Sequence, residues 1–194
     1  MEFLAKNNKT SKILRKIKTS ERGAIFVEMA IVLPIFILLI SGIFEISMYI
    51  LIHNKLLRVA GVVGDTITRQ NTTAANVVDI MNTSFNIFQP LIFTPAGSVV
   101  VSQISNSKLS ALPEDMLINW QYAINGAVSA LGTTGKFPVN LPNNISVTSN
   151  QSMVVTEVFY NYKPLVFPNF IAAQSIYITS VFVPRMGDMN TLTG

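Results

Sequence analysis

Glu28 is the side chain whose position most demands a chemical explanation. The twelve residues 29–40 that follow it carry no polar side chain, and residues 1–22 before it carry seven basic and two acidic side chains. An unpaired carboxylate inside a bilayer costs roughly 2.5–3.5 kcal/mol on insertion scales. Glu28 also stands five positions after Gly23. We therefore expect this carboxylate to have a charge partner, or to lie near a membrane face.

Other reactive side chains are few. The chain has no cysteine and one histidine, His53, which excludes disulfides, thiolate metal sites, a cysteine nucleophile and metal sites built from several histidines. No P-loop, dinucleotide-binding glycine motif, zinc-protease motif or Ser/His/Asp setting is present. The adjacent acidic pair Glu114–Asp115 is predicted to cap a turn or strand, and His53 to be solvated near a membrane exit. We therefore predict no catalytic, cofactor-binding or metal-binding residue, and no enzyme.

A long helix is predicted to position Glu28. It should begin near Ala24, cross a membrane to about Ile52 and continue as an amphipathic helix to Gln70. Pro34 cannot donate a backbone hydrogen bond, so a kink is expected there. At about 1.5 Å per residue, residues 24–52 exceed a hydrocarbon core of ~30 Å. Glu28 should then lie near the cytoplasmic face.

The same length places Glu45 near the opposite interface, where its carboxylate can reach water. Beyond it, apolar residues recur at helical spacing and predict a stripe packed on a globular domain. The stripe comprises Leu56, Leu57, Val59, Ala60, Val63 and Ile67. Gly61 and Gly64 could permit close packing, or could merely weaken the helix.

The remainder of the chain predicts an α+β domain. Residues 71–73 can end the first helix and cap a second one over residues 74–88. Four β-rich segments follow, at residues 98–105, 117–123, 153–162 and 175–183, and should form one antiparallel sheet packed on the helical continuation. Alternation in the second segment predicts that Ile118, Trp120 and Tyr122 share one face.

The positive charge is confined to the N-terminal arm. The chain carries a net charge of +4, but the residues after position 22 hold seven basic and eight acidic side chains. Nothing outside the arm therefore indicates nucleic-acid binding. A basic cluster beside an apolar run predicts a cytoplasmic N-terminus, with the C-terminal domain on the other side of the membrane.

The stretch from Glu21 to Ile40 resembles the processing site of the type IV pilin superfamily. In that pattern a basic leader ends in glycine, cleavage follows the glycine, and glutamate stands fifth in the mature chain, as Gly23, Ala24 and Glu28 do here. More narrowly, the run from Arg22 to Pro34 resembles TadE/TadF-type minor pseudopilins of tight-adherence pili, although Met29 stands where that family usually has an aromatic residue. The end of the chain resembles the same family at Tyr160, Tyr162, Pro164, Pro184 and Arg185.

The resemblance implies a three-part chain: a basic leader at 1–23, a membrane helix with its amphipathic continuation at 24–70, and an extracytoplasmic α+β domain at 71–194. It implies cleavage after Gly23 by a prepilin peptidase and a role in assembling or priming a tight-adherence pilus. The implied partners are that peptidase, other pilin or pseudopilin subunits through the N-terminal helix, the inner-membrane assembly machinery and the lipid bilayer. The implied location is the bacterial inner membrane, with a single pass and a periplasmic C-terminal domain. Whether the chain enters the fibre stays open, as does the choice between TadE-like and TadF-like identity.

Two alternatives remain. A signal-anchored envelope protein with an extracytoplasmic binding domain would have the same topology without cleavage at Gly23. A secreted protein would be cut after the apolar run, where Leu39-Ile40-Ser41 is a poor match to a signal-peptidase site. The N-terminal residue of the mature protein distinguishes all three.

Overall fold

The computed structural model describes residues 21–70, 72–106, 115–187 and 189–192. Most of the predicted leader therefore lies outside the described residues, as do Asn71 and Glu114. The chain divides into two compact units, one ending at Ile46 and the other spanning Ser47–Gly194.

The predicted long helix is confirmed. Helix α2 runs without interruption over 48 residues, Glu21–Thr68, and its backbone remains helical through Pro34. It begins three residues earlier than predicted, so Gly23 lies within its first turn. Its first part, up to Ile46, belongs to the first unit, and its remaining residues belong to the second.

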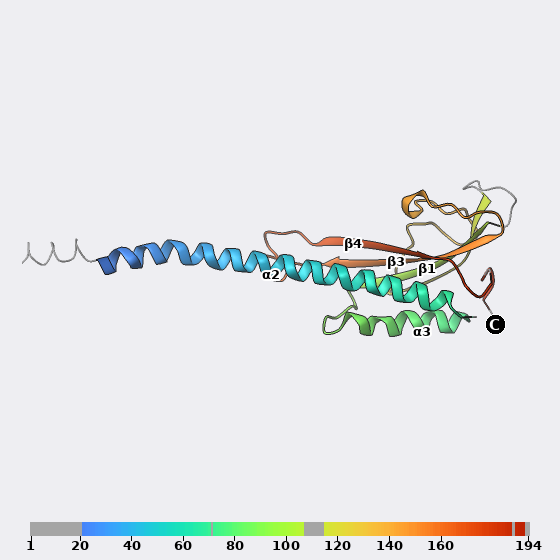
Figure 1. Cartoon of the computed structure of the whole chain (residues 1–194), viewed down its shortest axis with the longest axis horizontal. Helices are drawn as coiled ribbons and strands as arrows, with labels where there is room; N and C mark the ends of the chain where they lie inside the picture. Colours follow the sequence, from blue (N-terminus) through green and yellow to red (C-terminus); the bar gives the residue numbers. More distant parts are fainter. Residues whose placement is uncertain (1–20, 71, 107–114, 188, 193–194) are drawn as a thin grey trace, which may run out of the picture. The chain divides into compact units, whose positions relative to one another are not determined.

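In the second unit, the remainder of α2 and helix α3 (Ala74–Ser84) lie over one face of a β-sheet (Figure 1). The Thr73 side chain caps α3 by accepting a hydrogen bond from the Asn76 N–H at 3.2 Å, as predicted for this turn. The short 3-10 helix η1 (Phe85–Phe88) follows α3 directly. The predicted stripe on α2 is buried except for Leu57, which is 46% exposed.

The sheet has four antiparallel strands in the order β2-β1-β3-β4. Each strand begins and ends within two residues of its predicted bounds. The strands are β1 (Gly97–Asn106), β2 (Met116–Ile124), β3 (Gln151–Tyr162) and β4 (Gln174–Phe182). The predicted α+β fold, with two helices and one antiparallel sheet, is confirmed.

One predicted face assignment in β2 is wrong. The register between β1 and β2 shifts between Gln103 and Ile104, so that Asn119 has no partner opposite it. Its side chain instead donates hydrogen bonds to Gln103 at 2.6 Å and to Ser105 at 2.7 Å. Such a bulge inserts one extra residue and breaks the two-residue alternation. Trp120 therefore packs in the helix-facing core, while Ile118 packs in the core on the opposite face.

That opposite face is covered by the long connection between β2 and β3. Its side chains Leu131 and Val147 are buried against Ile104, Ile118 and Val155, with Leu141 packed alongside. The connection has little regular structure, apart from the short 3-10 helix η3 (Pro142–Asn144). The sheet is thus a middle layer between helices and an irregular covering segment.

The two glycines of the amphipathic part of α2 have different surroundings. A Cβ added at Gly64 would lie 2.5 Å from the Phe182 ring of β4, whereas one added at Gly61 would have nothing within 4 Å. Close packing of helix on sheet therefore requires glycine at position 64 and not at position 61.

We expect Gly64→Ala to lower the free energy of unfolding by about 1 kcal/mol, because overpacking costs about 1–3 kcal/mol and alanine returns only about 1 kcal/mol of helix propensity. The matched variant Gly61→Ala should instead be up to about 1 kcal/mol more stable. Thermal unfolding of the full chain in detergent micelles measures both. Equal shifts in the two variants would contradict the packing explanation.

Candidate functional site

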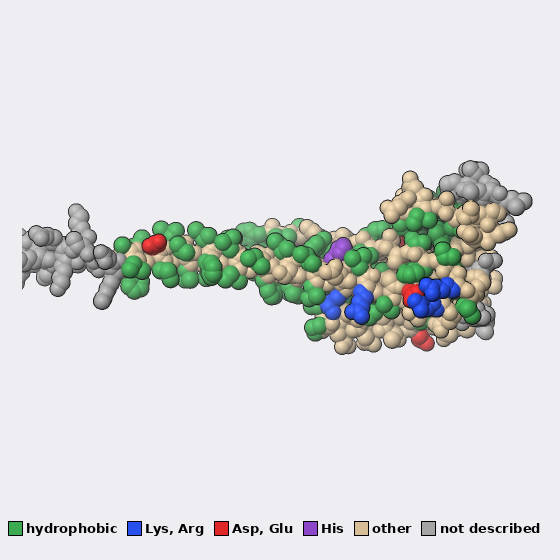
Figure 2. All heavy atoms as spheres, in the orientation of Figure 1, with side chains coloured by type: hydrophobic (Ala, Val, Ile, Leu, Met, Phe, Trp, Pro, Cys, Tyr) green, Lys and Arg blue, Asp and Glu red, His purple; other side chains and the backbone are tan. Residues whose placement is uncertain are grey.

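The first part of α2 is apolar on every side. The large hydrophobic side chains between Ile25 and Ile40 are 50–76% exposed, and Figure 2 shows hydrophobic side chains along its visible face. Helix α2 is long and apolar enough to cross a membrane, and it is one such helix among the residues described. Because a spanning helix needs about 20 apolar residues, this segment has the properties of a single-pass membrane anchor.

Glu28 interrupts this apolar surface. Its side chain is exposed and lies on α2 four residues after Ala24, so both residues share one helix face. Gly23 is exposed as well, and a Cβ added there would meet nothing within 4 Å. Alanine at an open helix position is about 1 kcal/mol more favourable than glycine. Among the described residues, no contact therefore requires a glycine at position 23.

Glu45 differs from its prediction. The residue is 6% exposed. The expectation that its carboxylate reaches water is therefore wrong. A periodicity argument places a residue along the helix axis but cannot show what surrounds its side chain.

His53 is half-buried on α2, and its ring centroid lies 6.5 Å from that of Tyr49. Within the described ranges, no group of three or more His, Cys, Asp or Glu side chains could hold a metal ion. His53 therefore has an aromatic neighbour and no surrounding ligand set among the described residues.

Two tyrosines of β3, Tyr160 and Tyr162, join the sheet to the helical layer. Tyr162 is 5% exposed, and its ring meets Tyr49 of α2 edge-on at a centroid distance of 5.3 Å. Tyr160 packs beside Phe88 and Phe93, and its partial burial raises the pKa of its hydroxyl. Both tyrosines therefore pack in the core between the sheet and the helical layer.

The Pro-Arg element after β4 has a backbone role. The Arg185 N–H donates a hydrogen bond to the Thr68 carbonyl at 2.9 Å. Thr68 is the last residue of α2, and the final carbonyls of a helix lack intrahelical partners. The residue after Pro184 therefore satisfies one carbonyl at the end of α2.

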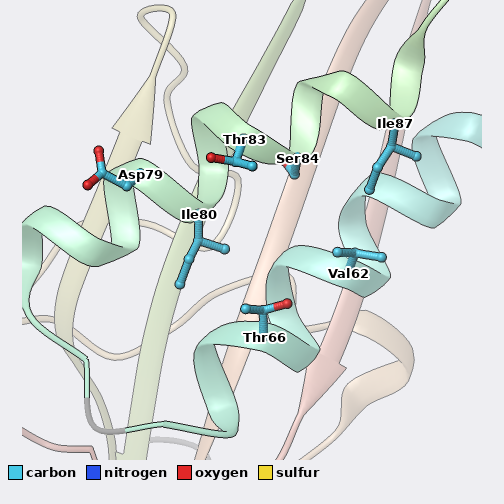
Figure 3. Close-up of a pocket in the computed structure, with 7 residues that line it drawn as sticks. All are labelled: Val62, Thr66, Asp79, Ile80, Thr83, Ser84 and Ile87. Carbon is cyan, nitrogen blue, oxygen red and sulfur yellow. The ribbon is translucent and has the colours of Figure 1, made fainter.

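A groove of about 390 Å³ lies between α2 and α3, and it was not predicted from the sequence (Figure 3). Ile80 and Ile87 point toward the α2 residues Val62 and Thr66 that form its other wall, and Asp79 lies at one end. Thr83 and Ser84 complete the lining. The lining offers apolar contact, hydroxyls and one carboxylate, but no pairing of a nucleophile with a base.

A buried carboxylate on the opposite face of the sheet was also missed. Glu157 of β3 is 0% exposed. It accepts hydrogen bonds from the Ser129 hydroxyl, from the Ala130 N–H at 2.9 Å and from the Tyr177 hydroxyl at 2.9 Å. A buried charge needs such donors, because an unpaired one is strongly destabilising. Glu157 therefore fastens the β2–β3 connection to the sheet. A lone glutamate inside a β-rich segment was the available signal in the sequence.

This arrangement predicts a pH dependence of stability. Burial, and then the nearby charge and hydrogen bond of Glu157, raise the pKa of the Tyr177 hydroxyl well above its usual value. A raised folded-state pKa contributes stability that is fully present below the unfolded-state pKa of about 10 and is lost as the pH rises through the folded value. We expect Tyr177→Phe to cost about 1 kcal/mol at neutral pH and to lose less stability than the wild type between about pH 9 and pH 11. Urea unfolding at several pH values measures this, and parallel pH profiles for the two proteins would refute it.

The family model of TadE-like proteins matches residues 23–62. This stretch begins at the glycine singled out from the sequence, includes Glu28 and Pro34, and ends within the amphipathic part of α2. No curated protein and no solved structure matches the chain. The resemblance predicted from the sequence is thus confirmed for the segment that carries the apolar helix.

Proposed function

We propose, from the TadE-like match over residues 23–62, that this chain is a minor pseudopilin-like membrane protein that assembles or primes a tight-adherence pilus. That match is the observation that carries the proposal, and at its coarsest it indicates a pilus-associated membrane protein. The chain should act through its apolar helix and its folded domain. It is not expected to turn over a substrate.

In this proposal a prepilin peptidase removes residues 1–23. Gly23 supports this step because no described residue lies close enough to require a glycine there, and recognition by the peptidase is the reason we propose for it. The bond to be cut follows Gly23 within the first turn of α2.

The proposed topology follows from charge. The seven basic side chains of residues 1–22 keep the N-terminus in the cytoplasm, and the nearly neutral remainder crosses the bacterial inner membrane. Residues 24–70 then form the anchor and its amphipathic continuation, and residues 71–194 form the periplasmic domain.

Cleavage would give Ala24 an α-amine with an unperturbed pKa near ~8. Glu28 lies one helical turn away and can neutralise that amine, or the amine of a neighbouring subunit. An unmatched charge is costly in lipid, so the pairing would set the register in which pilin-type helices pack. The exposed apolar surface of α2 supplies the packing area, and the inner-membrane assembly machinery would receive the complex.

The test of this function is the N-terminal sequence of the protein purified from membranes of a host that expresses the pilus system. We expect it to begin at Ala24. A start at Met1 in the membrane fraction would support the signal-anchored alternative, and a start beyond the apolar run in a soluble fraction would support the secreted one. Either result would reject the pseudopilin-like proposal.

A further inference from the structure

The connection between β3 and β4 is an unusually apolar surface loop. Between Lys163 and Gln174 it contains no acidic residue, and Lys163 is its one basic residue. Phe170 is 88% exposed and Leu165 is 62% exposed, with Val166 and Ile171 at 39% each. Exposed apolar patches of this kind mark interaction sites on soluble domains.

The tip of this loop is ordered by its own backbone. The N–H groups of Phe170 and Ile171 both donate hydrogen bonds to the Phe167 carbonyl, at 3.1 and 2.9 Å. The Phe167 ring meets the Phe170 ring edge-on at a centroid distance of 6.5 Å. A closed turn therefore holds Phe170 outward, where it has no protein cover.

The loop lies at the end of the domain where α2 enters. A hollow of about 180 Å³ is lined by Met48 and Ile52 of α2, by Leu165 and by Ile92 of the segment that precedes β1. Ile92 is itself 78% exposed. Two loops that are distant in sequence thus place apolar side chains beside the first residues of α2 that belong to the domain.

Counting residues along α2 shows where the residues that line this hollow lie relative to the membrane-spanning part of the helix. A hydrocarbon core of ~30 Å corresponds to about 20 residues at about 1.5 Å each. A span that starts near Glu28 therefore leaves the core close to Met48. Met48 and Ile52, which line the hollow, therefore belong to the part of α2 at or just beyond the end of that span.

The charges at this end suit a membrane surface. Lys55 extends to the Ile87 and Gln89 carbonyls, at 3.2 and 2.6 Å, just before the segment that carries Ile92. Lys163 is exposed at the base of the β3–β4 loop. No Asp or Glu lines the hollow, and Glu45, three residues before Met48 on α2, is the acidic residue nearest to it along that helix. An exposed basic side chain such as Lys163 beside apolar ones fits headgroup phosphates above acyl chains.

We propose that Ile92, Phe170 and Ile171 insert into the bilayer leaflet on the side of the domain, so that the domain rests on the membrane through a second contact besides α2. The inference rests on the membrane anchorage of α2 in the proposed function. The bilayer is favoured as the occupant because two residues that line the hollow, Met48 and Ile52, belong to the same helix as the anchor. Tethering makes the second contact intramolecular, at a high effective concentration, whereas a protein partner would first have to be captured.

The absence of cysteine from the wild-type chain permits a direct test on the full-length protein. Single variants Phe170→Cys, Phe137→Cys and Leu38→Cys are labelled with an environment-sensitive fluorophore and reconstituted in nanodiscs that contain one copy each. Quenching by lipids with a spin label on the upper acyl chain reports insertion. Phe137 is the matched control, a 57% exposed phenylalanine on the β2–β3 connection, and Leu38 lies within the apolar part of α2.

We expect a blue shift and strong quenching at positions 170 and 38, and neither at 137. Adding Ile92→Ser and Ile171→Ser to the Phe170→Cys variant should abolish the quenching at 170. Quenching that persists would mean that tethering alone brings the loop near lipid, and would overturn the inference.

Quenching at 38 with none at 170 would overturn this inference and leave the anchor intact. No quenching at 38 would reject the anchor and the inference together. A shift at 170 that appears only at several copies per disc, without lipid quenching, would indicate contact with a second copy and would also overturn the inference.

Discussion

Gly23→Val is expected to leave the protein uncut, so that it migrates as a chain longer than the wild type by the 23 residues of the leader. A protease subsite that fits a residue without a Cβ cannot easily accept a branched side chain. The fold itself tolerates the change, because a Cβ at position 23 meets nothing within 4 Å. Insertion should persist as well, because the apolar run is unchanged. Gel mobility and mass spectrometry of the protein in the membrane fraction show whether the leader is still attached.

Gly42→Val is the matched control for this prediction. Gly42 lies on the same helix, and a Cβ added there also meets nothing within 4 Å. This variant should be cut normally, since it leaves the predicted cleavage bond untouched. If Gly23→Val were shortened to the same extent as Gly42→Val, cleavage after Gly23 would be wrong.

Glu28→Ala is expected to separate processing from assembly. Removing a carboxylate from an apolar helix should leave insertion unchanged or improved, and the leader should still be removed. The amine of Ala24 then loses its partner in lipid. An unpaired charge in lipid costs roughly 2.5–3.5 kcal/mol, so the affinity for other pilin-type helices should fall on the order of 100-fold. Crosslinking and pull-down of partner pilins from membranes, together with piliation counts, measure the effect.

The control for Glu28 moves the carboxylate without deleting it. In the double variant Glu28→Ala/Met29→Glu, the charge lies five residues after Ala24, about 100° further around the helix. The total charge is preserved, so a role as a simple interfacial carboxylate predicts normal assembly, whereas a register role predicts a defect as large as in Glu28→Ala. Wild-type association and piliation in Glu28→Ala would rule out the charge-register mechanism.

The elements themselves were predictable because their signals are local. The apolar run, the stripe from Leu56 to Ile67 and the four β-rich segments each have a period that a short window of sequence contains. Turn and cap residues such as Thr73 mark boundaries in the same local way. The fold class and the bounds of the strands therefore followed from the sequence, and so did the resemblance around Gly23 and Glu28, since that motif lies within one continuous stretch.

Which face of the sheet or helix each side chain occupies was harder to predict from the sequence. A single bulge opposite Asn119 places Ile118 and Trp120 in separate cores, although their spacing predicts a common one. The bulge arises from how β2 pairs with β1, and pairing between strands is not visible within one strand. Burial of Glu45 escaped prediction for a related reason, because helical periodicity gives a position along an axis and not the neighbours around it.

By itself, the sequence determined the long apolar helix, its carboxylate five residues after Gly23, and an α+β domain of two helices and four strands. Only the tertiary structure decided why Gly64 and not Gly61 is needed, where the Glu157 carboxylate finds its three donors, and which loops meet beside Met48. Each of these features joins residues far apart in the chain. Such contacts are set by packing and by the satisfaction of buried polar groups, neither of which leaves a periodic pattern in the sequence.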